Sequence, residues 1–292
     1  MENKTIKKKR TKTITLSVIG IALVLLIVWI AWGNNALELN SYSIASNSLP
    51  KEFDGFRIAH VSDLHNAEMG KDNEKLISML ADAEPDIIVI TGDMIDSRNT
   101  KVDVALAFAE QAVKIAPCYY VTGNHEARVD EYSDLKDGLI ELGVTVLEDA
   151  KTEMACSGES IVLVGVSDPS FQTDYLFGDD ETVLNSKLNE LISEEDGYVI
   201  LLSHRPELFD TYVENKVDLI FSGHAHGGQF RIPFIGGVVA PNQGLFPKFD
   251  AGIYTEGNTN MVVSRGVGNS IIPFRVNNRP EVILIELTTQ GE

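Results

Sequence analysis

Cysteine is almost missing from this chain of 292 residues, which contains only Cys118 and Cys156. Zinc-finger sites need closely spaced cysteine or histidine pairs, and these two cysteines lie too far apart to be ligands of that kind. Outside the cytoplasm a disulfide between them is allowed, but Cys118 opens an apolar run, which favours a buried thiol. The sequence leaves both states of the thiols open.

Basic residues are also scarce. Lys and Arg number 24 against 43 Asp and Glu, which gives a formal net charge of −19. An acidic body repels phosphate backbones at long range, so nucleic acid is not expected as a general partner. The N-terminal tip is the exception, because six of its first twelve residues are Lys or Arg and only Glu2 is acidic.

No charged residue occurs from Thr13 to Ala36, a run long enough to cross a hydrocarbon core of about 30 Å. A buried core helix would keep a polar stripe, so we predict a transmembrane signal anchor over residues 13–33 and a basic cytoplasmic tip over residues 1–12. The positive-inside rule then places the remainder on the extracytoplasmic side of the cell membrane, as a single-pass protein. A cleaved signal peptide is the alternative, since Ala31-Trp32-Gly33 is a weak small-x-small site.

The remaining sequence divides into a linker and one domain. Residues 34–52 are rich in Asn and Ser and predict a short polar linker, so the catalytic domain is expected over 53–292. Strands are predicted over 57–62, 86–91 and 118–122, alternating with helices over 73–83, 102–114 and 130–142. Further strands are predicted over 160–166, 198–202, 219–222, 261–264 and 281–287, and an acidic, solvated helix lies within 174–196. This order predicts an α/β fold of two packed sheets with helices outside.

Five of the six histidines fall in short polar signatures, each placed directly after a predicted strand. These signatures contain seven residues of metal-ligand type: Asp63, His65, Asp93, Asn124, His204, His224 and His226. In open α/β sheets the loops beyond the carboxyl ends of strands form the ligand crevice, so the signatures are expected to converge. His60 lies inside a strand and is expected to be structural.

The predicted ligand set combines oxygen and imidazole without thiolate. Such a set suits divalent Mn, Fe, Co or Zn and argues against Cu(I) or an iron–sulfur cluster. Seven ligands exceed the four of a tetrahedral centre, and an aspartate such as Asp93 can bridge two ions about 3.5–4 Å apart. Two such ions polarise a phosphoryl oxygen and hold a hydroxide formed at neutral pH. We therefore predict two divalent cofactor ions (Mn, Fe or Zn) and hydrolysis at phosphorus.

The signatures Asp63-x-His65, Gly92-Asp93, Gly123-Asn124-His125-Glu126, His204 and Gly223-His224-Ala225-His226, in this order, resemble the calcineurin-like metallophosphoesterase superfamily from Phe53 to Leu287. Residues 203–210, 227–229, 264–268 and 277–281 resemble its membrane-associated bacterial branch of YkuE- and YaeI-like phosphodiesterases. The resemblance implies a four-layer αββα sandwich of two mixed sheets. It also implies that Asp63, His65, Asp93 and His226 hold one metal and that Asp93, Asn124, His204 and His224 hold the other.

The resemblance further implies that His125 is not a ligand but a catalytic residue, which stabilises or protonates the leaving-group oxygen. Asp96, three residues after Asp93, is the expected partner that orients the His125 ring. Glu126 and Arg205 adjoin the signatures, and each is either a substrate contact or a plain surface charge. The apolar segment from Ile232 to Pro241 is either a buried hairpin or an exposed rim that accepts an acyl chain.

The predicted function is a membrane-anchored, outward-facing phosphohydrolase that cleaves a phosphodiester or pyrophosphate, with a lipid-linked or envelope component as the suggested substrate. A phosphomonoesterase or protein phosphatase is an alternative, because selectivity depends on the shape of the pocket rather than on the ligand set. A metal-binding scaffold without activity is a further alternative. The complete ligand set and the presence of His125 count against the scaffold.

Overall fold

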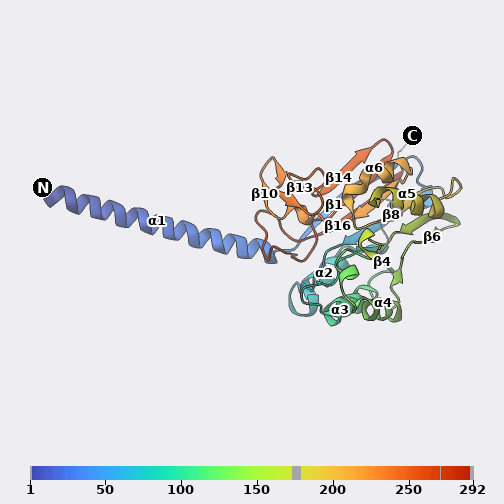
Figure 1. The fold of residues 1–292 in the computed structure, drawn as a ribbon, viewed down its shortest axis with the longest axis horizontal. Coiled ribbons are helices and arrows are strands. Elements are labelled where there is room, and N and C mark those ends of the chain that lie inside the picture. The colour runs from blue at the N-terminus through green and yellow to red at the C-terminus, as the bar shows by residue number, and fades with distance from the viewer. Residues whose placement is uncertain (1, 173–178, 270, 290–292) are drawn as a thin grey trace.

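Two six-stranded sheets stack face to face in the computed structural model, which describes residues 2–172, 179–269 and 271–289 (Figure 1). The first sheet has the order β1-β16-β2-β3-β4-β5. Its strands are β1 (Glu38–Ser46), β16 (Glu281–Thr289), β2 (Arg57–Val61), β3 (Ile87–Thr91), β4 (Cys118–Val121) and β5 (Thr145–Val146). Strands β2 to β5 are mutually parallel, and β16 runs antiparallel to β2.

The second sheet has the order β14-β15-β9-β8-β7-β6. Its strands are β14 (Gly252–Glu256), β15 (Thr259–Val263), β9 (Leu219–Ser222), β8 (Val199–Leu202), β7 (Glu159–Gly165) and β6 (Ala150–Cys156). Two short hairpins stand apart from it: β10 (Arg231–Ile232) with β11 (Gly236–Gly237), and β12 (Val239–Ala240) with β13 (Gly244–Leu245). Both main sheets are mixed, as predicted.

Helices cover the outer face of each sheet. They are α2 (Glu74–Asp82), α3 (Val102–Ala112) and α4 (Tyr132–Glu141) on the first sheet, and α5 (Asp180–Leu191) and α6 (Phe209–Glu214) on the second. One apolar core fills the space between the sheets, where Ile58 and Val89 meet Leu163 and Phe221. Separate cores lie beneath the two groups of helices. The layers are therefore helix, sheet, sheet, helix, and the predicted four-layer αββα sandwich is confirmed.

The polar linker predicted over residues 34–52 contains a strand of the first sheet. Strand β1 occupies Glu38–Ser46 and pairs in parallel with all of β16, from Glu38 opposite Glu281 to Ser46 opposite Thr289. The polar residues misled the sequence reading because an edge strand has a neighbour on one side only and exposes many of its side chains. The fold thus begins at β1 and not at Phe53.

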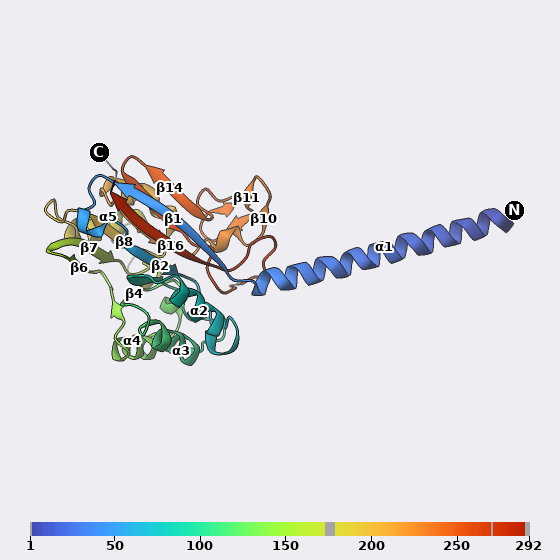
Figure 2. The same ribbon diagram turned by 180° about the vertical axis from the view of Figure 1, so that it is seen from behind.

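The helix α1 (Glu2–Asn35) projects away from the sandwich (Figures 1 and 2). Its segment from Thr11 to Asn35 reaches a mean hydropathy of 2.8 over 18 residues, none of them buried, so it is long and apolar enough to cross a membrane. Such a helix serves as a membrane anchor or a signal. It ends against the sandwich, where the Asn34 side chain donates to the Arg275 carbonyl (2.9 Å) and accepts from the Arg275 N–H (2.8 Å).

Three further expectations can be compared with the structure. Both cysteines are free thiols, with Cys118 buried and Cys156 partly exposed. The acidic helix predicted within 174–196 is α5, although it buries Leu184 and Leu188, and residues 174–178 lie outside the described part. The apolar segment after β10 is not a buried hairpin, because Phe234 is fully exposed and Ile235 is 65% exposed.

Candidate metal centre

The seven predicted ligands follow five strands that end at one edge of the sandwich. Strands β2, β3 and β4 of the first sheet lead into Asp63, Asp93 and Asn124, and β8 and β9 of the second lead into His204 and His224. Since parallel strands present their carboxyl ends at a common edge, the loops of both sheets meet there. All seven side chains are buried.

The backbone at the centre is held in an uncommon conformation. Five of the seven residues have a positive φ, between 44° and 63°: Asp63, His65, Asp93, His224 and His226. Side chains other than glycine adopt this left-handed region rarely and at an energetic cost, which the surrounding structure must offset. Such strain is typical of functional sites, because it directs side chains that a relaxed loop would turn elsewhere.

One group consists of Asp63, His65, Asp93 and His226, each of which offers a ligand atom within 4.8 Å of the others. The Nε2 atoms of His65 and His226 are 3.2 Å apart. His226 Nε2 lies 3.3 Å from Asp63 Oδ1, and His65 Nε2 lies 3.5 Å from Asp93 Oδ2. Four ligand atoms that face one another this closely form a site of the size that a metal ion requires.

The second group contains Asp93, His204 and His224. His204 Nε2 is 3.3 Å from Asp93 Oδ2, the same oxygen that faces His65. Asn124 is buried, and its Oδ1 has no hydrogen-bond partner among the described residues; the same holds for His204 Nε2. An unpaired buried acceptor such as Asn124 Oδ1 is costly, and a bound cation would satisfy it. At His204 Nε2 a cation would take the place of a proton. The residues present therefore fit two metal ions that share Asp93.

Hydrogen bonds with the surrounding residues orient the predicted ligands toward the centre. The Nδ1 of His204 donates to the Thr91 carbonyl at 2.6 Å, which leaves its Nε2 to face Asp93. Ser62 Oγ donates to Asp63 Oδ2 at 2.6 Å. Such outer contacts orient ligands and set the tautomer of a ligating imidazole. Burial would raise the pKa of Asp93, but the neighbouring histidines, chiefly His204, lower it well below its usual range, so this carboxylate is ionised.

His125 lies beside the first group, with its ring centroid 4.5 Å from that of His65. The Ser97 N–H donates to His125 Nδ1 at 3.0 Å, which in the neutral ring places the proton on Nε2. Asp96 Oδ1 is 3.7 Å from His125 Nδ1, and the Asp96 carboxylate also accepts from the N–H and Nε of Arg98, both at 2.9 Å. The structure thus places Asp96 and Ser97 together at one side of the His125 ring.

Both sequence-based interpretations of Glu126 are wrong. Its side chain is fully buried and accepts three backbone hydrogen bonds: from Gly123 at 2.8 Å, from Asp93 at 2.9 Å and from Ile95 at 3.3 Å. Glu126 therefore ties the loop after β3 to the loop after β4, and it neither faces solvent nor contacts substrate. Burial and the Asp93 carboxylate raise the pKa of Glu126 to about 7.

Arg205 is not a surface charge either. It is 5% exposed, and its guanidinium donates to both oxygens of Asp168, at 2.5 and 2.8 Å. Its Nη1 lies 3.3 Å from Nε2 of His224. Sequence reasoning missed Asp168, although it follows β7 in the same way that Asp63 follows β2, and this position at a strand end was the available clue.

His60 is structural, as expected. It is fully buried within β2, and its Nε2 shares a hydrogen bond of 2.8 Å with Thr91 Oγ1. Burial lowers the pKa of His60 to about 3, so the ring is neutral.

Comparisons with known proteins agree with this geometry. The metallophosphoesterase YkuE of Bacillus subtilis is 29% identical over 259 residues, which cover 86% of this chain and 85% of that protein. The phosphodiesterase YaeI of Escherichia coli is 27% identical over 247 residues, covering 80% of this chain and 82% of YaeI. Among solved structures, TT1561 of Thermus thermophilus matches with a TM-score of 0.51 and 15% identity, over 73% of this chain and 90% of that one.

The family model of the calcineurin-like phosphoesterases matches residues 56–228, a range that contains all seven predicted ligands and His125. The matched range covers more than half of the chain and includes both groups of candidate metal ligands. This chain therefore belongs to the calcineurin-like phosphoesterase family and is a metal-dependent phosphoesterase with a dimetal site.

Proposed function

We propose that this protein is a membrane-anchored, outward-facing phosphohydrolase that cleaves a phosphodiester or pyrophosphate bond in a lipid or envelope component. The observation that carries the proposal is the pair of buried ligand groups that share Asp93, with His125 directly beside them. Asp63, His65, Asp93 and His226 would hold one ion, and Asp93, Asn124, His204 and His224 the other. Two ions bound there would polarise the phosphoryl oxygen and supply a nucleophile from water at neutral pH.

The role proposed for His125 follows from its proton. Because Ser97 donates to Nδ1, the neutral ring carries its hydrogen on Nε2 and can donate it to the oxygen of the departing group. Burial lowers the pKa of His125 to about 4, so the ring is neutral at physiological pH. Asp96 is proposed to position the ring through its loop, because the N–H of the next residue, Ser97, bonds to Nδ1 and Arg98 holds the Asp96 carboxylate in place.

The anchoring role of α1 rests on its length, its apolar exposed surface and the basic residues that precede it. A lysine-rich flank favours the cytoplasmic side, which would put the sandwich outside. Cleavage of a diester is supported by the similarity to YaeI, whose name describes a phosphodiesterase.

The test uses the full chain in a neutral detergent, treated with EDTA and then supplied with Mn²⁺. We expect metal-dependent turnover of a chromogenic diester between pH 6 and 9, and faster turnover of the diester than of the matching monoester. Absence of metal-dependent turnover on either ester would refute the enzymatic role, and faster monoester turnover would refute the diester preference.

A variant tests His125 separately. His125→Ala should lower the rate by about 10²–10⁴-fold on an ester with a poor alkoxide leaving group, because general-acid catalysis contributes about that much. The loss should be much smaller for a p-nitrophenyl ester, whose leaving group needs no proton, and the metal content should not change. An equal loss on both esters would contradict the proposed proton donation.

A further inference from the structure

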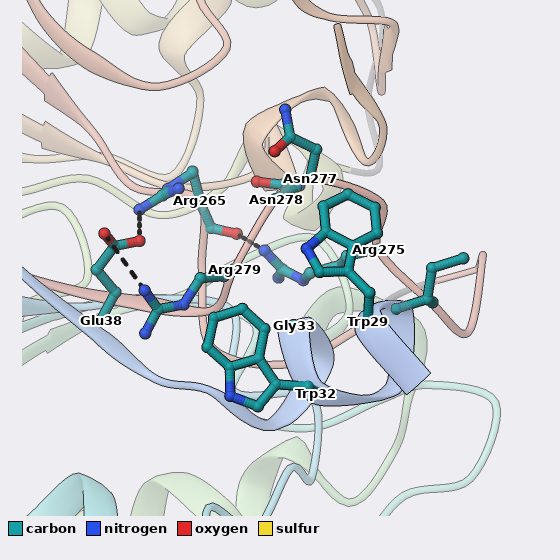
Figure 3. Close-up of a pocket in the computed structure, with 10 residues that line it drawn as sticks. Trp29, Trp32, Gly33, Glu38, Arg265, Arg275, Asn277, Asn278 and Arg279 are labelled. Carbon is teal, nitrogen blue, oxygen red and sulfur yellow. Dashed lines mark hydrogen bonds and ion pairs between the residues drawn. The ribbon is translucent and has the colours of Figure 1, made fainter. Parts of the chain in front are cut away.

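A cavity of about 260 Å³ lies where α1 meets the sandwich, and we call it the anchor pocket. Trp29 and Trp32 of α1, Glu38 of β1, and Arg265, Arg275 and Arg279 line it (Figure 3). The lining therefore contains three guanidinium groups and one carboxylate, in a chain whose net charge is −19. The anchor pocket is a local positive site on an acidic protein.

The arginines of the anchor pocket are only partly neutralised. Arg265 pairs with Glu38 at 3.0 Å and with Glu281, which lies behind it, at 2.6 Å. Arg279 donates to the Ala36 and Leu37 carbonyls, at 2.8 and 3.0 Å, and lies 3.7 Å from Glu38.

Arg275 is fully buried and donates to neutral acceptors: the Arg265 carbonyl at 2.6 Å, the Gly268 carbonyl, and Asn269 Oδ1 at 3.2 Å. Among the described residues, only Glu38 and Glu281 form ion pairs with these three guanidinium groups. The Asp63 carboxylate, which attracts Arg275 at longer range, belongs to the metal centre. The pocket therefore keeps a positive charge that an anion would complement.

The position of the pocket points to the membrane interface. Trp29 and Trp32 lie in the last two turns of the apolar segment and are 43% and 56% exposed. Tryptophan concentrates at the level of lipid headgroups, where its ring is partly apolar and its N–H reaches polar groups. Arg279 lies over the ring of Trp32 at 5.2 Å, so a cation and an aromatic ring share that level.

Exposed apolar side chains surround the same end of the sandwich. They are Phe234, Ile235, Leu245, Phe246 and Phe274. Phe274 lines a groove together with Ile27 and Ile30 of α1, and its ring lies 5.5 Å from that of Phe230, just before β10. The hairpins that carry the other side chains lie on the side of the sandwich nearest α1 in both views (Figures 1 and 2). Exposed apolar patches of this kind mark contacts with a membrane or a partner.

The strand topology puts the metal centre at this end as well. Strand β1 starts at Glu38, directly after α1, and runs parallel to β16, while β16 runs antiparallel to β2. The carboxyl end of β2, which leads to Asp63, therefore lies at the edge where β1 begins. Arg275 connects the end of α1 to the metal centre, because it bonds to Asn34 of α1 and its Nη2 lies 3.5 Å from Nδ1 of His226.

We propose that the anchor pocket binds the headgroup phosphate of an anionic phospholipid from the bilayer in which α1 is anchored. The inference rests on the proposed anchoring of α1. Arginine forms planar, charge-assisted hydrogen bonds with phosphate oxygens, and the excess positive charge favours a headgroup without a cation of its own. The bound lipid would offset the repulsion between an acidic domain and an anionic membrane surface, and would hold the metal edge of the sandwich against the bilayer.

The test is native mass spectrometry of the full chain in a neutral detergent, with phosphatidylglycerol or phosphatidylcholine added at equal concentration. We expect saturable retention of phosphatidylglycerol and several-fold weaker retention of phosphatidylcholine. Arg279→Gln should weaken retention of phosphatidylglycerol about tenfold, which is the effect of losing one charge-assisted contact. Arg279→Lys, which keeps the charge, should restore most of it.

Arg57→Gln is the matched control, because the Arg57 and Arg279 side chains are both 33% exposed and Arg57 lies at the opposite end of β2. Its retention of phosphatidylglycerol should equal that of the wild type. Equal retention of the two lipids, or equal losses in Arg279→Gln and Arg57→Gln, would overturn the proposal. Competition by inorganic phosphate or glycerol 3-phosphate at lipid concentrations would show a site for soluble phosphate and would also overturn it.

Two measurements on the same sample separate this proposal from the proposed function. The intact mass shows whether residues 1–35 remain attached, and a cleaved chain would refute the anchor on which the lipid site depends. Wild-type turnover of a soluble phosphoester tests the metal centre without reference to lipid. Retention of lipid without turnover, or turnover without retention, would therefore identify which of the two proposals is wrong.

Discussion

Replacement of Glu126 by Ala should destabilise the protein and weaken its metal centre, although Glu126 is not expected to touch either ion. The carboxylate accepts the backbone N–H groups of Gly123, Asp93 and Ile95, all in a buried region. Alanine would leave these three donors without an acceptor. The loops that carry Asp93 and Asn124 would then lose the contact that fixes their relative position.

The size of the effect follows from these three bonds. An unsatisfied buried donor costs about 1–3 kcal/mol. The Ile95 bond is long at 3.3 Å, and removal of Glu126 also relieves its repulsion with Asp93, so we take the lower end, about 1 kcal/mol for each donor. The total of about 3 kcal/mol corresponds to a change of about 100-fold in the ratio of folded to unfolded protein. For a domain of this size it lowers the Tm by about 6–12 °C.

Calorimetry of the metal-free full chain in detergent measures this change, since both tryptophans lie in α1 and do not report on the sandwich. Glu126→Gln can keep the Gly123 and Asp93 bonds, so it should lose only about 1 kcal/mol. Glu110→Gln is the exposed control and should change stability by less than about 0.5 kcal/mol. If Glu126→Ala melts within 2 °C of the wild type, at roughly a third or less of the expected shift, and binds Mn²⁺ equally well, the reasoning is wrong.

Three further outcomes are expected. Gly123→Ala should abolish tight metal binding, measured by titration, because its new Cβ would lie 2.2 Å from Asp93 Oδ1. Gly138→Ala is the control, since its new Cβ meets the flexible Leu106 side chain, and its metal binding should match the wild type. Native protein should react with a thiol reagent at Cys156 alone, since burial raises the pKa of Cys118 to about 12, and two fast-reacting thiols would contradict this. Burial lowers the pKa of His204, but Asp93 outweighs it and raises the pKa to about 10, so metal must displace a proton. Mn²⁺ affinity should therefore rise with pH between 6 and 9, with proton release in calorimetry, and a pH-independent affinity would contradict this. The folding stability of the metal-free protein depends on pH in the opposite direction. The stabilisation from protonated His204 is complete below about pH 6.5, the unfolded pKa, and is lost as pH rises through 10.

Local patterns in the sequence predicted much of the fold. The strands β2, β3, β4, β8 and β9 are short apolar runs that end in polar signatures, and the structure has them within one or two residues of the prediction. The βα alternation in the first half and the strands of the second half together implied two sheets with helices outside. The pairing partners and the edge strands were not predictable, since β1, for example, bonds to residues about 240 positions away.

The residues of the metal centre could also be predicted from local sequence patterns, since ligand-type residues at strand ends must meet where parallel strands share an edge. The residues that support the predicted ligands could not be predicted in this way. Glu126 and Arg205 were assigned as substrate contacts or surface charges, because nothing in the sequence shows that the backbone donors of two loops, or the carboxylate of Asp168, surround them.

The sequence by itself determined the fold class, the residues of metal-ligand type and the apolar N-terminal helix, because each depends on residue type and on spacing along the chain. Tertiary structure alone decided that β1 belongs to the sheet, and that Arg265, Arg275 and Arg279 gather beside Trp29 and Trp32. These residues lie more than 200 positions apart. Their proximity results from the antiparallel course of β16 and β2, which brings the end of the anchor helix and the metal centre to the same edge of one sheet.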